Sequence, residues 1–160
     1  MVVDAKRQEL VARVGLRTSD TIAHALSRSS RLFHERALAE VRAAGFPEVK
    51  QRWIALLPHL SGEGIRSSEL SERLEITRQG TGQLIGELEG FGYVERVPDP
   101  TDGRAKLVRL TDRGWAAWLA GLEALRSLEA ELETALGRPA LQALRQHVPR
   151  LLAALEGLED

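Results

Sequence analysis

Residues 67–110 contain two hydrophobic patterns whose order constrains the fold more than any other feature of this chain. Two short stretches of helical periodicity, 67–75 and 77–90, follow one another with almost no connection between them. Polar and apolar side chains then alternate over 93–97 and 106–110, as they do in β-strands. Between these strands, residues 98–103 are prolines, aspartates, a threonine and a glycine, which predicts a hairpin turn.

Two helices joined by a tight turn and followed at once by a hairpin form a winged helix-turn-helix. This arrangement suits DNA, because the major groove admits the second helix while the hairpin reaches the flanking phosphates or the minor groove. Arginine pairs with guanine and glutamine with adenine. The polar face of the second helix contains Thr77, Arg78, Gln79, Gly82 and Gln83. The hairpin contributes Arg104, Lys106 and Arg109.

Helical patterns also precede the motif. The periodicity predicts a short helix over 5–14, then a long helix that Ser19 or Asp20 caps and that ends at Gly45. A further helix over 48–60 is expected to kink or end at Pro58, since proline lacks the amide hydrogen that a helix needs. A very short strand is expected at Ile65.

Two long helices are predicted after the motif. Thr111 caps the first, over 112–136, whose leucines form a stripe at helical spacing. The second begins at Pro139 and continues to about Leu155, with a kink at Pro149. The fold class is therefore mainly α with a small β wing: a winged helix-turn-helix plus a helical lobe.

Composition narrows the function classes. The chain has 160 residues, no cysteine and a formal net charge of −1, so any contact with nucleic acid must be local. The short stretch 103–113 is basic, whereas 114–160 is acidic. The lack of cysteine excludes thiolate metal sites and thiol-based redox sensing. No apolar stretch approaches the ~18 residues of a membrane span, and no signal peptide is evident, so a cytoplasmic protein without membrane contact is expected.

The stretch from about 65 to 115 resembles the MarR family of bacterial transcription regulators. In that family the wing tip carries a D-x-R motif, and an L-T-x-x-G motif begins a dimerisation helix. The matching residues are Asp102-Gly103-Arg104-Ala105-Lys106 and Leu110-Thr111-Asp112-Arg113-Gly114.

The resemblance implies a non-enzymatic homodimer that binds a pseudo-palindromic operator in double-stranded DNA and acts as a repressor, without a cofactor. It further implies that Arg104 enters the minor groove, with Asp102 orienting its guanidinium group. Arg78, Gln79 and Gln83 match major-groove positions. The expected organisation is N-terminal dimerisation helices over 1–45, a DNA-binding lobe over 46–111 and C-terminal dimerisation helices over 112–160.

Family members often respond to small aromatic or anionic molecules bound between the helical lobe and the DNA-binding lobe. Such an effector is therefore expected here, and the residues that could line its crevice are Trp53, His59, His24 and His34. Trp53 also shares a face with apolar residues of its helix, which favours a place in the core.

The chain departs from the family pattern at two points. Gly80, Gly82 and Gly86 stand in the second helix of the motif, where each interior glycine costs about 0.5–1 kcal/mol relative to alanine. They suggest a pliable helix or a close approach of the backbone to phosphate. Arg66 stands where a serine or threonine often caps the first helix, so Ser67 is the expected cap.

Other functions have weaker support in the residues. The glycines of 80–86 superficially match a dinucleotide-binding loop, but a helix and not a strand precedes them. Asp99 and Asp102 do not complete a calcium-loop pattern, and no two of the four histidines have the spacing of metal ligands, so no metal is expected. The alternative from another class is a winged-helix module that binds a protein, which the acidic residues Glu87 and Glu89 would favour.

Overall fold

The computed structural model describes residues 21–54, 56–60 and 63–158. The long helix α2 (Ile22–Ala43) is capped by Thr21, whose hydroxyl accepts a hydrogen bond from the His24 amide at 3.2 Å. The predicted caps Ser19 and Asp20 and the predicted helix over 5–14 lie outside the described residues. Gly45 follows α2 with φ 104°, so the predicted end of this helix is confirmed.

The expected single helix over 48–60 is wrong. In the described residues of this stretch, the chain forms one α-helical turn, α3 (Gln51–Ile54), and a 3₁₀ turn at Leu57–His59. Pro58 stands in the first turn of this 3₁₀ segment. Its ring removes an amide donor and disfavours the helical conformation of the preceding residue, which explains why no continuous helix forms here.

The helix-turn-helix and the wing follow in the predicted order. They consist of β1 (Ile65–Arg66), α4 (Ser67–Arg73), α5 (Arg78–Gly90), β2 (Val94–Asp99) and β3 (Asp102–Leu110). The sheet has the order β1-β3-β2 and is antiparallel, with Val94 opposite Leu110 and Ile65 opposite Val108. The mainly α fold with a small β wing is therefore confirmed.

The two helices of the motif differ at their ends. Gly92, with φ 73°, follows the C-cap of α5. The cap of α4 is Arg66 and not Ser67, and no side chain caps this helix. Ser67 already belongs to its first turn, where its carbonyl accepts the Ser71 hydroxyl at 2.7 Å.

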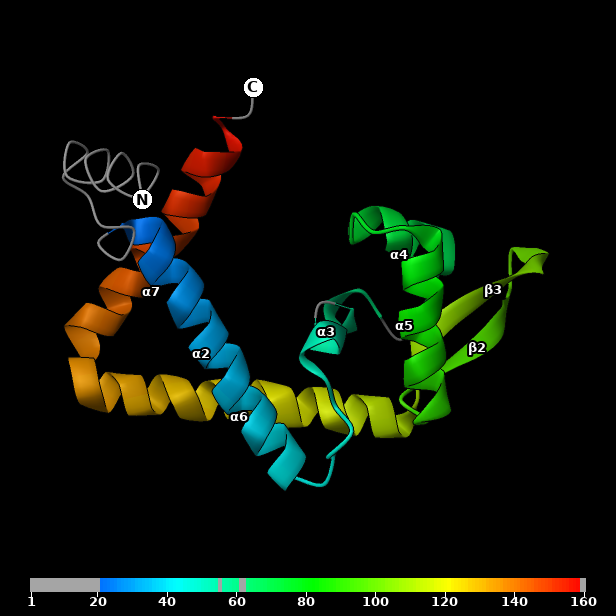
Figure 1. Cartoon of the computed structure of the whole chain (residues 1–160), viewed down its shortest axis with the longest axis horizontal. Coiled ribbons are helices and arrows are strands. Elements are labelled where there is room, and N and C mark those ends of the chain that lie inside the picture. Colours follow the sequence, from blue (N-terminus) through cyan, green and yellow to red (C-terminus); the bar gives the residue numbers. More distant parts are fainter. Residues whose placement is uncertain (1–20, 55, 61–62, 159–160) are drawn as a thin grey trace, which may run out of the picture.

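Helix α6 (Asp112–Leu136) is the longest element and connects the two parts of the molecule. Figure 1 shows α2 crossing α6, with the helix-turn-helix and the wing near the N-terminal end of α6 and α7 (Arg138–Glu156) near the other end. Thr111 caps α6, as the sequence predicts, and Gly137 is its C-cap. Helix α7 continues through Pro149.

The main core lies beneath the helix-turn-helix. Trp53 is 1% exposed there and packs against Tyr93 with ring centroids 5.7 Å apart. Leu70 of α4 and Ile85 of α5 are completely buried in the same cluster, which fixes the angle between the two helices. A smaller cluster of Ala37, Ala124 and Leu128 joins α2 to α6. None of the helices in the described part of the chain combines the length and the apolar character needed to span a bilayer.

Candidate nucleic-acid interface

Helix α5 presents its predicted DNA-contacting side chains to solvent because its opposite face is buried. Thr81, Ile85 and Leu88 point into the core. Arg78, Gln79 and Gln83 are exposed, and within the described residues none of their side chains has a hydrogen bond or an ion pair. The polar face of α5 is therefore available for an external partner.

Thr77 has a structural role in this helix. Its hydroxyl accepts a hydrogen bond from the Gly80 amide at 3.1 Å and caps α5, while its carbonyl accepts the Thr81 hydroxyl at 3.2 Å. Thr77, which the sequence places on the polar face of this helix, thus fixes its first turn, and that turn carries Arg78 and Gln79.

The wing carries a second exposed cationic surface. Arg104 and Lys106 lie on β3 near the hairpin turn, are exposed, and have no side-chain partner among the described residues. Arg109, farther along the same strand, differs because it forms an ion pair with Glu95 at 2.7 Å. Only the two cations nearest the tip are therefore free to meet phosphate.

Asp102 holds the wing in a different way from the one the family resemblance implies. Its Oδ1 accepts a hydrogen bond from the backbone amide of Arg104 at 3.1 Å, and its Oδ2 lies 3.8 Å from Arg66 Nη2. The Asp102 carboxylate therefore fixes the main chain at Arg104. Among the described contacts, it forms no hydrogen bond or ion pair with the guanidinium group of Arg104.

The acidic residues of α5 face the protein and not the exposed polar face. Glu87 accepts hydrogen bonds from Arg52 at 2.6 Å and from the Trp53 indole at 3.0 Å, and Lys50 lies 3.6 Å away. Glu89 is paired with Arg96 at 3.2 Å. These internal partners neutralise both carboxylates, which leaves Arg78 as the charged group at the start of the exposed face.

The Glu87 cluster makes stability depend on pH. Hydrogen bonds from Arg52 and then Trp53 lower the pKa of Glu87 from 4.5 to about 2. Since the folded-state pKa is depressed, ionised Glu87 stabilises the fold fully above pH 4.5, and this contribution is lost as the pH falls towards 2.

We expect Glu87→Gln to reduce the loss of Tm between pH 5 and pH 2.5, because the glutamine has no proton to gain. The measurement is a series of thermal melts of both proteins in steps of pH. Hydrogen bonds from Thr101, together with Arg66, also lower the pKa of Asp99 to about 2, so some acid sensitivity remains in the variant. Equal losses of Tm in the two proteins would contradict the assignment to Glu87.

The glycines of α5 lie in a regular helix that has space for side chains. A Cβ added at Gly82 or Gly86 meets no atom within 4 Å, whereas one at Gly80 lies 3.2 Å from the Thr77 hydroxyl. The stretch 80–86 is helical throughout, which is incompatible with a dinucleotide-binding loop.

We therefore expect Gly82→Ala to raise the free energy of unfolding by about 0.5–1 kcal/mol, since alanine loses less backbone entropy in a helix. Urea denaturation measures this change. Gly80→Ala is the comparison, and its gain is expected to be smaller because the new methyl crowds the cap. No gain at Gly82 would mean that α5 is not a regular helix in solution.

Two ion pairs that the sequence did not predict stabilise this surface. Arg66 pairs with Asp99, and Arg52 pairs with Glu87; the members of each pair are more than thirty residues apart. Both oxygens of Asp99 are occupied by Arg66 and Thr101, so this residue serves the hairpin turn and not a calcium loop. No cluster of three potential metal ligands occurs in the described residues.

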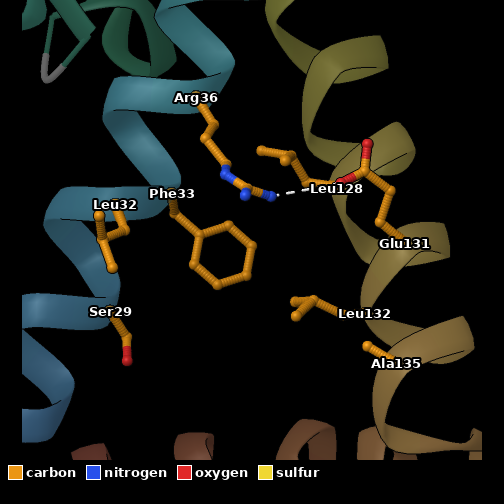
Figure 2. A pocket seen from close by; sticks show the side chains of 8 residues that line it. All are labelled: Ser29, Leu32, Phe33, Arg36, Leu128, Glu131, Leu132 and Ala135. Carbon is orange, nitrogen blue, oxygen red and sulfur yellow. Dashed lines mark hydrogen bonds and ion pairs between the residues drawn. The ribbon is translucent and has the colours of Figure 1, made fainter.

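The predicted effector residues lie on α2, on α3 and in the 3₁₀ turn at Leu57–His59. Trp53 is a core residue, His34 and His59 are half-buried, and His24 is exposed on α2. A cavity of about 400 Å³ instead opens between α2 and α6. In Figure 2 the Phe33 ring points into it opposite Leu132, and Arg36 forms an ion pair with Glu131 at 3.3 Å. None of the four predicted residues lines this cavity.

Known proteins share both the sequence motif and the fold. The MarR family profile matches residues 48–105. The transcriptional activatory protein BadR of Rhodopseudomonas palustris is 33% identical over 97 residues, which cover 58% of this chain and 54% of BadR. The uncharacterized protein Rv2011c of Mycobacterium tuberculosis is 30% identical over 121 residues, or 76% of this chain and 84% of that protein.

One of the similar solved structures contains DNA. The transcriptional repressor CouR, bound to a 23-mer DNA duplex, is 25% identical to this chain. The match has a TM-score of 0.65 and covers 84% of this chain and 94% of CouR. With its exposed recognition helix and wing, this non-enzymatic, DNA-binding chain belongs to the MarR family of transcriptional regulators.

Proposed function

We propose that this protein is a homodimeric repressor that reads a pseudo-palindromic operator with two copies of α5 and anchors itself with two wings. The observation that carries the proposal is the exposure of Arg78, Gln79, Gln83, Arg104 and Lys106 on one helix and one hairpin without partners among the described side chains. Glutamine and arginine on a helix fit major-groove base edges, and cations on a hairpin fit phosphates or the minor groove.

The experiment that tests this function is selection of bound duplexes from a random-sequence pool, followed by binding measurements over a range of salt concentrations. DNA recognition predicts recovery of a two-fold symmetric sequence with half-sites about one helical turn apart and a Kd that rises steeply with salt. A protein-binding module predicts no enrichment of any sequence. The internal pairing of Glu87 and Glu89 favours the DNA function over that alternative.

Repression is the proposed regulatory outcome. CouR, which is named a transcriptional repressor, resembles this chain over most of both lengths, whereas BadR is named an activatory protein and matches over about half of its own length. A reporter gene placed behind the selected operator distinguishes repression from activation. Repression predicts lower expression with the protein present, and higher expression would favour activation.

The proposed dimer uses the helical parts 1–45 and 112–160, with 46–111 as the DNA-binding lobe. Apolar side chains on α6 and α7 are exposed in the single chain, and a second copy would cover them. They are Leu119, Leu122, Leu125, Leu136, Leu144, Val148, Leu152 and Leu155.

We expect Leu119→Glu to raise the dimer dissociation constant at least about tenfold, because this side chain is 59% exposed in the single chain and a buried charge is costly. Analytical ultracentrifugation gives the constant. Ser127→Glu is the matched control, since it adds the same charge to α6 at an exposed position outside the leucine stripe. An unchanged dimer constant in Leu119→Glu would remove this face from the interface.

A small aromatic or anionic effector is also proposed. The cavity between α2 and α6 has an apolar lining that includes Phe33 and Leu132, and Arg36 could meet an anionic group at its rim. An effector that binds one separation of the two lobes better would shift the population of DNA-competent dimers. Benzoate is a simple probe: the proposal predicts that it weakens DNA binding of the wild type and has less effect on Arg36→Ala.

A further inference from the structure

Arg66 joins three elements at the base of the wing. It is the second residue of β1, it pairs with Leu107 on β3, and it is the N-cap of α4. Its side chain does not cap the helix but extends along the sheet to the hairpin turn, where Nε donates to Asp99 Oδ2 at 2.7 Å. The start of α4 is thus connected to the wing by this side chain, in addition to β1 and the buried core that includes Leu70 and Val108.

Asp99 receives this contact in a nearly buried position. Its side chain is 5% exposed, while that of Arg66 is 42% exposed. Its other oxygen, Oδ1, accepts hydrogen bonds from the amide and the hydroxyl of Thr101 at 2.8 and 2.7 Å. One oxygen of Asp99 therefore shapes the turn, and the other attaches the turn to Arg66. Loss of Arg66 would leave a buried carboxylate without its counter-charge.

Further contacts connect Asp99 to the tip of the wing. Asp99 is paired with Asp102 across the hairpin, beside an irregularity in the register, and Asp102 holds the Arg104 amide at 3.1 Å. Arg66 also lies 3.8 Å from Asp102. An open hollow of about 610 Å³, lined among others by Gly64, Glu69 and Pro100, lies beside the pair. The ion pair between Arg66 and Asp99 therefore attaches the turn to β1 beside this hollow.

We propose that Arg66 is a positioning residue for the wing: through Asp99 and the hairpin turn, it fixes the direction in which Arg104 is presented to DNA. This inference rests on the proposed DNA-binding function. It differs from a direct phosphate contact, because Arg66 acts only if Arg104 is present to make the contact.

A double-mutant cycle in DNA binding tests this dependence. The full chain is compared with Arg66→Ala, Arg104→Ala and the double variant on the duplex that the wild type selects. We expect Arg66→Ala to raise the Kd about tenfold in the wild-type background and less than about twofold in the Arg104→Ala background. Arg66→Lys, which keeps the charge, is expected to recover part of the loss.

Arg73→Ala is the matched control, because Arg73 is the last residue of α4 and, among the described residues, pairs with Glu69 alone, at 2.6 Å. Its effect on Kd is expected to be small and equal in both backgrounds. Thermal melts establish that each variant is folded at the assay temperature, and Arg66→Gln replaces Arg66→Ala in the cycle if the alanine variant is not.

The outcomes separate this inference from the proposed function. A wild type that selects no DNA sequence contradicts the function itself. A wild type that binds DNA, an Arg104→Ala variant that binds weakly and an Arg66 variant with the same loss in both backgrounds would overturn only the positioning role. An Arg66 variant that binds like the wild type would do the same.

Discussion

Gly114→Ala is expected to lower the free energy of unfolding by about 3 kcal/mol or more, near the upper end of the usual cost of overpacking. A Cβ at this position would lie 2.0 Å from the Tyr93 carbonyl oxygen and 3.0 Å from Leu110 Cδ2. The same carbonyl accepts the Thr111 amide at 3.1 Å, so the first turn of α6 cannot move away without losing this hydrogen bond to the residue that precedes β2. The loss is large against a typical total stability of about 5–15 kcal/mol.

Urea denaturation followed by circular dichroism measures this change. Gly121→Ala is the matched control on the same helix, since its new Cβ would meet only Val41 Cγ2, at an ordinary 3.9 Å. This control is expected to gain about 0.5–1 kcal/mol from the better helix propensity of alanine. If both variants gained stability, the close packing of α6 against Tyr93 would not exist in solution.

Arg104→Ala is expected to raise the Kd for the selected operator about 100-fold. A dimer loses two arginines, and each contact with DNA is worth about 1–1.5 kcal/mol, or roughly tenfold in Kd. The slope of log Kd against log salt should fall by about 2, since one counterion is released for each arginine that meets the DNA. Fluorescence anisotropy at several salt concentrations gives both quantities.

Arg126→Ala removes the same charge from α6, where Arg126 pairs with Glu123 on an exposed surface. It is expected to change Kd less than about threefold, which separates a local contact from a change in net charge. Gln83→Ala provides the contrast on α5: it should lose the preference at one base pair of each half-site while leaving the salt slope unchanged. An Arg104→Ala variant with the affinity and slope of the wild type would mean that the wing does not contact DNA.

Local signals in the sequence predicted most of the fold. Thr111 stands three residues before the Gly114 amide that it caps, and Gly45 has the positive φ that a chain needs after a helix. These interactions depend only on near neighbours, so α5 and α6 were predicted nearly to their ends. The hairpin was predicted, but its strands are longer than the expected 93–97 and 106–110, since β2 continues to Asp99 and β3 begins at Asp102. The helix over 48–60 failed because Pro58 and the packing of Trp53 outweigh an apolar spacing that looks helical.

For the candidate interface, the sequence likewise predicted the features that depend on near neighbours and not those that depend on distant contacts. The exposure of Gln79 and Gln83 followed from the apolar residues on the other face of α5. The partners of the charged residues could not be predicted, because Arg66 and Arg52 carry the same charge as the free Arg104, and sequence spacing does not choose among carboxylates. None of the four predicted effector residues lines the cavity between α2 and α6, because sequence spacing does not show which side chains of α2 face α6.

The sequence by itself determined the order of elements, the polar face of α5 and the basic wing, because periodicity, caps and turns act over a few residues. Only the tertiary structure decided which arginines are free, since Asp99 and Glu87 reach their partners across the fold. The requirement for glycine at position 114 likewise became a physical one only when the Tyr93 carbonyl was found against it. Contacts between distant segments depend on how the elements pack, and local pattern does not encode that packing.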